Sequence, residues 1–132
     1  MKVFIVEDAE IVREALTTLL SEIPGVEVIG AAADEQGAIA QICAMGPDVV
    51  ILDISLQPGS GIDVLEAVKK HNPAIKVVML TNYTDEIYVN RCMSAGADYF
   101  FDKSHEFMRV GAVLRQLVLT GGLDNPIVTS AQ

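Results

Sequence analysis

Three carboxylates stand directly after apolar runs of the sequence, at the points where strands would end. Glu7 and Asp8 follow Val3–Val6, and Asp53 follows Val49–Leu52. An uncharged run of four apolar residues is typical of a buried strand, and burying an unpaired carboxylate is costly. Asp53 could simply form the following turn, and Glu7 and Asp8 could simply start a helix. A shared site for all three carboxylates is the alternative explanation.

Two further polar residues, Thr81 and Lys103, follow apolar runs in a similar way. Thr81 ends the run Ile75–Leu80, and Lys103 lies just past Ala97–Phe101. Taken singly, a threonine here is most often a turn or cap residue, and a lysine is most often a solvated charge. Four strand ends that carry this set together are poorly explained by capping. We therefore expect Lys103 to lie beside the carboxylates. If its head is solvated there, Lys103→Ala should affect phosphorylation more than folding.

A cation would resolve the repulsion within such a cluster. Clustered carboxylates raise one another's pKa unless a positive charge lies between them. Mg²⁺ prefers oxygen ligands, and it usually takes one or two carboxylates directly while keeping several waters. One Mg²⁺ and the ammonium group of Lys103 would balance three negative charges. The sequence therefore predicts a Mg²⁺ site, on condition that the strand ends converge.

Five strand candidates alternate with five helical segments along the chain. The expected strands are Val3–Val6, Val26–Ala31, Val49–Leu52, Ile75–Leu80 and Ala97–Phe101. The expected helices are Ala9–Ser21, Glu35–Ala44, Ile62–Lys70, Asp85–Ala95 and His105–Leu119, with Asp34, Ser60 and Thr84 as N-caps of the middle three. Strict alternation with apolar strands predicts an α/β fold, in which helices cover both faces of a parallel sheet. The carboxyl ends of its strands would then share one edge, where ligands bind.

Composition narrows the class of protein. The 132 residues are 51% hydrophobic and carry a net charge of −9, which favours one globular domain and disfavours binding to nucleic acid or anionic membranes. Cys43 and Cys92 lie in helical segments and are interpreted as buried thiols rather than as a disulfide. The apolar run at the start is too short for a secretory signal, so a cytoplasmic location is expected.

Four motifs together resemble the receiver domain of two-component response regulators, the CheY-like family. They are FIVED, VVILDISLQPGSG, VVMLT and GADYFFDKS, and the similarity extends over residues 2–119. The resemblance implies a (βα)5 flavodoxin-like three-layer sandwich with strand order 2-1-3-4-5. It also implies a receiver domain over residues 1–119 and a tail or linker over 120–132. The sequences of the segments VREALTTLL and PDVVILDI resemble those of the subgroup that often carries helix-turn-helix output domains.

The resemblance implies a role for each residue of the cluster. Asp53 would accept a phosphoryl group from a histidine kinase, a phosphotransfer protein or a small phosphodonor. Asp8 and Asp53 would bind Mg²⁺ directly, together with the backbone carbonyl of Ser55, and Glu7 would bind it through water. Lys103 would pair with the phosphoryl group. Such a protein is not an enzyme, apart from catalysing its own phosphorylation and dephosphorylation.

The resemblance also implies a switch and an output face. Thr81 would hydrogen-bond the phosphoryl group, and Phe100 would fill the switch-aromatic position. The last two helices and the strand between them would then contact a homodimer mate or an effector. On the helix expected over Asp85–Ala95, spacing predicts inward and outward sets. The inward set is Tyr88, Val89, Cys92 and Met93, and the outward set is Ile87, Asn90, Arg91 and Ser94, joined by Arg109 and Arg115 of the last helix.

Three positions depart from the family pattern. Gln57 stands where many receivers have proline, and Pro58 follows one place later, so a different loop shape is expected. Ser104 replaces the proline that often follows the lysine, so a cis peptide bond after Lys103 cannot be assumed. Phe100 lacks the hydroxyl of a tyrosine, so a switch there would work by packing alone.

Other functions are disfavoured by particular residues. A receiver-like interaction module that needs no phosphate would not require the complete set of Asp8, Asp53, Thr81 and Lys103. An aspartate-nucleophile phosphatase of the haloacid dehalogenase type has a second aspartate two places after the first, where this chain has Ser55. A flavodoxin-type cofactor binder would place phosphate after the first strand, where Glu7 and Asp8 would repel it.

Overall fold

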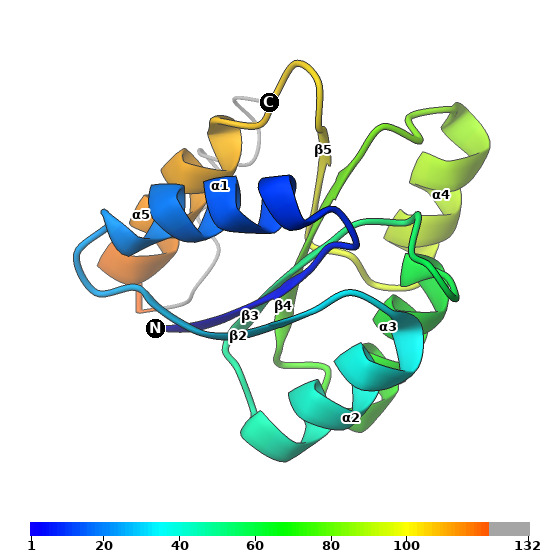
Figure 1. The fold of residues 1–132 in the computed structure, drawn as a ribbon, viewed down its shortest axis with the longest axis horizontal. Helices are drawn as coiled ribbons and strands as arrows, with labels where there is room; N and C mark the ends of the chain where they lie inside the picture. Colours follow the sequence, from blue (N-terminus) through cyan, green and yellow to red (C-terminus); the bar gives the residue numbers. More distant parts are fainter. Residues whose placement is uncertain (122–132) are drawn as a thin grey trace.

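The computed structural model describes residues 1–121, in which five parallel strands alternate with five helices (Figure 1). The strands are β1 (Lys2–Val6), β2 (Glu27–Ala32), β3 (Val49–Leu52), β4 (Lys76–Thr81) and β5 (Tyr99–Asp102). The helices are α1 (Glu10–Ser21), α2 (Glu35–Met45), α3 (Gly61–His71), α4 (Glu86–Ser94) and α5 (Arg109–Leu119). The sheet order is β2-β1-β3-β4-β5. These observations confirm the flavodoxin-like α/β fold and its strand order.

The sheet is the middle of three layers, with α1 and α5 on one face and α2, α3 and α4 on the other (Figure 1). Successive side chains of a strand point to opposite faces. In β1, Val3 and Ile5 therefore join the core under α1 and α5, whereas Phe4 and Val6 join the core under the other three helices. All four residues of β3 are buried, as expected of a central strand covered on both faces.

Two of the three predicted helix caps are confirmed. The Asp34 carboxylate accepts a hydrogen bond from Gly37 N at 2.7 Å, and Ser60 Oγ accepts one from Ile62 N at 3.2 Å. The prediction for Thr84 is wrong, because Asp85 is the N-cap of α4 and its side chain makes no capping bond. Thr84 N instead donates to Asn82 O in a tight turn, which delays the start of the helix.

The last helix begins at Arg109 and not at His105, as the sequence pattern had suggested. Two acidic side chains hold the preceding segment in a turn. Asp102 N donates to Glu106 Oε1 at 2.9 Å, and Ser104 N donates to Asp102 Oδ1 at 2.8 Å. A hydrogen bond with His105 also lowers the pKa of Asp102. Because these side chains bind backbone N–H groups locally, α5 starts after them.

The outward and inward sets predicted for α4 are confirmed except at one position. Cys92 is buried, Tyr88 and Val89 are half-buried, and Ile87 is exposed. Met93 was expected in the core, but 45% of its surface is exposed. The helix covers the edge of the sheet, so only the narrow stripe through Tyr88 and Cys92 faces the interior (Figure 1).

Both cysteines are free thiols, so the prediction that they form no disulfide is confirmed. Cys92 is buried, and burial raises the pKa of its thiol. Cys43 is only half-buried, so its predicted burial is wrong. In residues 1–121 no helix combines the length and apolarity that crossing a membrane requires. Of the predicted tail, residues 122–132 lie outside the described residues, so the domain boundary at 119 stays a prediction.

Candidate functional site

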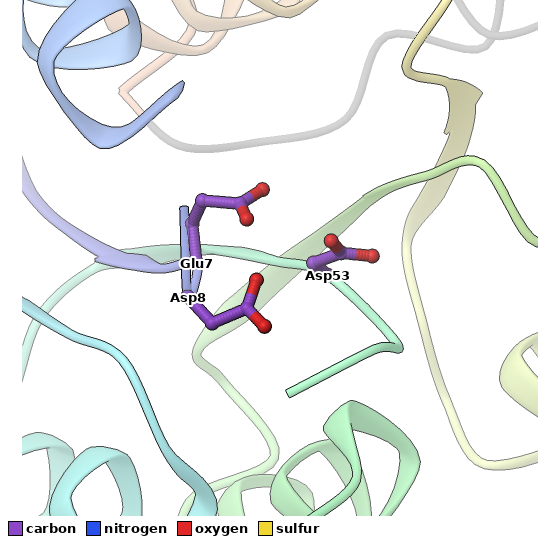
Figure 2. A group of neighbouring side chains, drawn as sticks. All are labelled: Glu7, Asp8 and Asp53. Carbon is purple, nitrogen blue, oxygen red and sulfur yellow. The ribbon is translucent and has the colours of Figure 1, made fainter. Parts of the chain in front are cut away.

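The predicted convergence of carboxylates occurs at the carboxyl edge of the sheet. β1 and β3 are neighbours, and Asp53 N donates to Val6 O at 3.1 Å, so the residues after both strands lie side by side. Figure 2 shows the side chains of Glu7, Asp8 and Asp53 gathered there. One carboxylate oxygen from each lies within 4.8 Å of the other two. Glu7 and Asp53 are buried, and Asp8 is half-buried.

Lys103 joins this cluster through its side chain. Its Nζ lies 2.6 Å from Glu7 Oε1 and 2.6 Å from Asp53 Oδ2. Its backbone N donates to Thr81 O at 2.9 Å, which fixes the end of β5 against the end of β4. Only 15% of the Lys103 side chain is exposed. The ammonium group is therefore largely buried rather than solvated, because it lies between two buried carboxylates.

The electrostatics of the site reflect burial and pairing. Burial raises the pKa of Glu7, and the charge of Asp53 adds to this, whereas hydrogen bonds from Lys103 and Ala9 N oppose it. Burial alone would lower the pKa of Lys103, but its hydrogen bonds to Asp53 and Glu7 outweigh that effect and raise it. One ammonium group against three carboxylates leaves two negative charges, which a divalent cation would balance.

The donor set fits Mg²⁺ in kind, because it consists of carboxylate oxygens on two adjacent strand ends. Ser55 lies beside it, since Ser55 N donates to Asp53 Oδ1 at 3.3 Å. The metal-binding role predicted for the Ser55 carbonyl stays a prediction.

The two predicted switch residues occupy different surroundings. Thr81 ends β4 and is fully buried, and its Oγ1 accepts a hydrogen bond from Tyr83 N at 3.2 Å. Phe100 is half-buried and packs against the core under α2, α3 and α4. Tyr88 of α4 packs against the same core. Phe100 thus lies on the side of the sheet where α4 lies, and β4 separates its strand from β3.

Sequence reasoning did not find several contacts that hold the site. Arg13 Nη1 donates to Glu7 O at 2.8 Å, and Ser104 Oγ donates to Asn82 Oδ1 at 2.7 Å. The second contact joins the loops after β4 and β5. The replacement of proline by Ser104 was the only signal for it. In residues 1–121 the single cis peptide bond joins Gln57 to Pro58, so the bond after Lys103 is trans.

Comparison with known proteins agrees with this geometry. The sequence model of the family described as the response regulator receiver domain matches residues 3–115, nearly the whole described chain. The chain belongs to this family. It is a receiver domain of two-component response regulators, and the competing assignments to a phosphatase or a flavodoxin-type binder are not favoured.

Relatives of this receiver domain include a longer regulator and two solved structures. The response regulator protein VraR of Staphylococcus aureus is 31% identical over 116 residues, which cover 88% of this chain and 56% of VraR. The receiver domain thus spans little more than half of the curated relatives it matches. The response regulator domain of Thermotoga maritima CheB is 26% identical with a TM-score of 0.81, covering 95% of this chain and 98% of that one. CheY in a CheX–CheY–BeF3–Mg complex from Borrelia burgdorferi is 27% identical with a TM-score of 0.75, covering 86% and 89%.

Proposed function

We propose that Asp53 is the phosphoacceptor of this receiver domain and that phosphorylation depends on Mg²⁺. The observation that carries the proposal is the position of Asp53, whose carboxylate lies 2.6 Å from Lys103 Nζ and shares a 4.8 Å cluster with Glu7 and Asp8. Asp53 is the one member of the cluster that ends the central strand β3. The CheY relative whose complex includes BeF3 and Mg supports the same chemistry.

The chain's own residues would divide the work of transfer. A carboxylate oxygen of Asp53 forms a bond to phosphorus while the bond from phosphorus to the donor breaks and the donor leaves with that electron pair. Lys103 donates hydrogen bonds to the transferring oxygens, and the Thr81 hydroxyl holds the new phosphoryl group. Water later attacks the phosphorus of the aspartyl phosphate, which restores the carboxylate and releases inorganic phosphate. The receiver domain would thus catalyse its own phosphorylation and dephosphorylation.

Asp8, Asp53 and the Ser55 carbonyl would hold Mg²⁺ directly, and Glu7 would hold it through water. When bound, the ion supplies positive charge against the oxygens of the transferring group. The donor would be a histidine kinase, a phosphotransfer protein or a small acyl phosphate. The test is incubation with a small acyl phosphate and Mg²⁺, followed by intact-mass measurement of the wild type and of Asp53→Ala.

Mg²⁺ should raise the melting temperature of the wild-type protein and lose most of this effect in Asp8→Asn. A ligand that binds only the folded state stabilises that state, and the substitution removes one charged ligand. We expect the metal-free variant to be as stable as the wild type or more stable, because one repelling carboxylate is gone. Thermal melts over a Mg²⁺ series measure both effects.

Asp63→Asn is the matched control, because Asp63 is an exposed aspartate in the first turn of α3. It should keep the full Mg²⁺ response. Equal stabilisation of the wild type and Asp8→Asn would reject the metal site.

We also propose that phosphorylation changes the surface formed by α4, β5 and α5, where a dimer mate or an effector would bind. Thr81 is the buried hydroxyl at the end of β4, and Phe100 packs on the side of the sheet that α4 covers. A hydroxyl that moves toward the phosphoryl group would free space that Phe100 can enter. The free energies of the two conformations need differ by only ~2 kcal/mol for phosphorylation to shift their populations.

Hydrogen exchange measured before and after phosphorylation should change at Phe100 and in residues 84–95, and Thr81→Ala should blunt this change. The substitution removes the group that couples the site to Phe100. Thr18→Ala, at an exposed position of α1, should behave as the wild type. Changes confined to residues next to Asp53 would contradict the proposed route.

A further inference from the structure

The loop between β3 and α3, residues 53–60, carries both Asp53 and Ser55, and its tip is exposed. Ile54 and Leu56 anchor its first half in the core, whereas residues 57–59 are exposed. The loop is closed by the bridge between Ser55 and Ser60 and by the bond from Gly61 N to Ile54 O at 2.7 Å. The tip, residues 57–59, lies beyond these closing contacts. Its position therefore depends on what it contacts outside the loop.

That contact is Glu35, the first residue of α2. Its side-chain Oε1 accepts a hydrogen bond from Ser60 N at 2.9 Å, across 25 positions of sequence. Its backbone N donates to Pro58 O at 3.2 Å. One residue thus binds two backbone groups of the tip. Glu35 is itself held in place, since Asp34 caps α2 beside it.

Gly59 brings the tip against the Glu35 side chain. Its φ of +106° is a conformation that other residues rarely adopt. A Cβ at this position would lie 2.4 Å from Glu35 Cβ and 2.7 Å from Glu35 Oε1. The close approach therefore requires glycine, and the contact joins Glu35 to the tip by packing as well as by hydrogen bonds.

The residues that Glu35 holds pack directly on the backbone of the phosphorylation site. Ser60 is the bridge partner of Ser55. A Cβ on the next residue, Gly61, would lie 1.8 Å from Asp53 O, so the two backbones are in contact there. A shift of Ser60 would thus displace the residues that carry the acceptor carboxylate and the Ser55 carbonyl.

We infer that Glu35 is a positioning residue, which acts through Ser60 to hold Asp53 and Ser55 in the geometry needed for Mg²⁺ binding and phosphoryl transfer. The inference rests on the proposed phosphorylation of Asp53. Glu35 is hydrogen-bonded to the backbone of the loop, and it acts through that backbone. α2 and α3 each carry buried residues of their own, such as Ile42 and Leu65, so we expect variants that break the contact to fold.

Three variants separate positioning from a general loss of structure. Glu35→Ala removes the acceptor oxygen, and Glu35→Gln keeps an oxygen that can accept from Ser60 N. Glu66→Ala, at an exposed position of α3, removes the same charge elsewhere. The measurements are exchange of the Ser60 amide by NMR, the Kd of Mg²⁺ by titration, and the phosphorylation rate with a small acyl phosphate, with melting temperature as a check on folding.

In Glu35→Ala we expect faster exchange at Ser60, weaker Mg²⁺ binding and a phosphorylation rate lower by roughly ten-fold, since small misplacements of reacting groups are costly. Glu35→Gln should recover most of each property, and Glu66→Ala should match the wild type. Gly59→Ala should resemble Glu35→Ala, because it pushes the tip away from an intact carboxylate. In the double variant Glu35→Ala/Gly59→Ala, the losses of Mg²⁺ affinity and phosphorylation rate should be smaller than the sum of the two single-variant losses. Both substitutions break the same contact.

Faster Ser60 exchange in Glu35→Ala with an unchanged Mg²⁺ Kd and phosphorylation rate would overturn the inference, because the contact would then only hold the loop. Failure of Glu35→Gln to recover the Mg²⁺ Kd would overturn it as well. If the wild type accepts no phosphate, the proposed function fails by itself. The Ser60 exchange and the Mg²⁺ Kd then decide the positioning role. A Kd that rises in Glu35→Ala and returns toward the wild-type value in Glu35→Gln supports it. Equal Kd values in the wild type and Glu35→Ala reject it.

Discussion

Wild-type protein incubated with a small acyl phosphate and Mg²⁺ should gain one phosphoryl group, and Asp53→Ala should gain none. Asp53 is the buried carboxylate that pairs with Lys103 while lying beside Glu7 and Asp8. Without it, no acceptor oxygen remains at the end of β3. Glu7 remains bound to Lys103 at 2.6 Å and is not a substitute, because that bond and the one from Ala9 N occupy both of its oxygens.

Two controls make this result specific. Asp63→Ala removes an exposed carboxylate ten positions farther along and should be phosphorylated like the wild type. Chelation of Mg²⁺ should abolish phosphorylation of the wild type without unfolding it. Circular dichroism should show that Asp53→Ala is folded. A phosphoryl group that persists in Asp53→Ala would place the acceptor at another residue and reject the assignment.

The position of the site could be predicted from sequence because it follows from chain order. Buried strands appear as apolar runs, and in a parallel sheet the residues after those runs meet at one edge. Glu7, Asp8 and Asp53 follow two runs that form neighbouring strands, and their carboxylates do converge. None of this required knowledge of side-chain conformation.

The errors arose where competing local contacts decide the outcome. α5 starts late because Asp102 and Glu106 bind nearby backbone N–H groups, a choice that helical spacing does not reveal. Met93 has the spacing of a core residue, but α4 covers only the edge of the sheet. Such results depend on which surface a helix finds opposite it.

The burial of Lys103 and the contacts of Glu35 could not be predicted from the sequence for another reason. Lys103 is 50 positions from Asp53 and 96 from Glu7, and Glu35 is 25 positions from Ser60. No local pattern distinguishes these residues from exposed charges on a loop or a helix. The place of Lys103 beside the carboxylates was predicted from the strand ends, but its burial and the Glu35 contacts are fixed only when the sheet has formed, so the structure was needed to identify them.

The second large effect is expected for Lys103→Met, which keeps a long side chain and removes its charge. In metal-free protein, the unfolding free energy should fall by about 3 kcal/mol, because Glu7 and Asp53 lose their buried partner. Phosphorylation should slow by roughly a hundred-fold, the effect of losing one donor to a developing charge. Mg²⁺ should stabilise this variant more than the wild type, because its three carboxylates have no competing cation. Denaturant unfolding with and without Mg²⁺ and phosphorylation time courses measure these effects.

Lys69→Met is the matched control, because Lys69 of α3 is a comparably buried lysine near the amino ends of β4 and β5, away from the carboxylate cluster. Its Nζ lies 2.8 Å from Asp98, and 14% of its side chain is exposed. The control should also lower the unfolding free energy, but its response to Mg²⁺ and its phosphorylation rate should equal those of the wild type. If Lys103→Met behaved in the same way as this control, Lys103 would serve stability alone. A larger Mg²⁺ response together with slow phosphorylation in Lys103→Met alone would show that its ammonium group both balances the carboxylates and takes part in transfer.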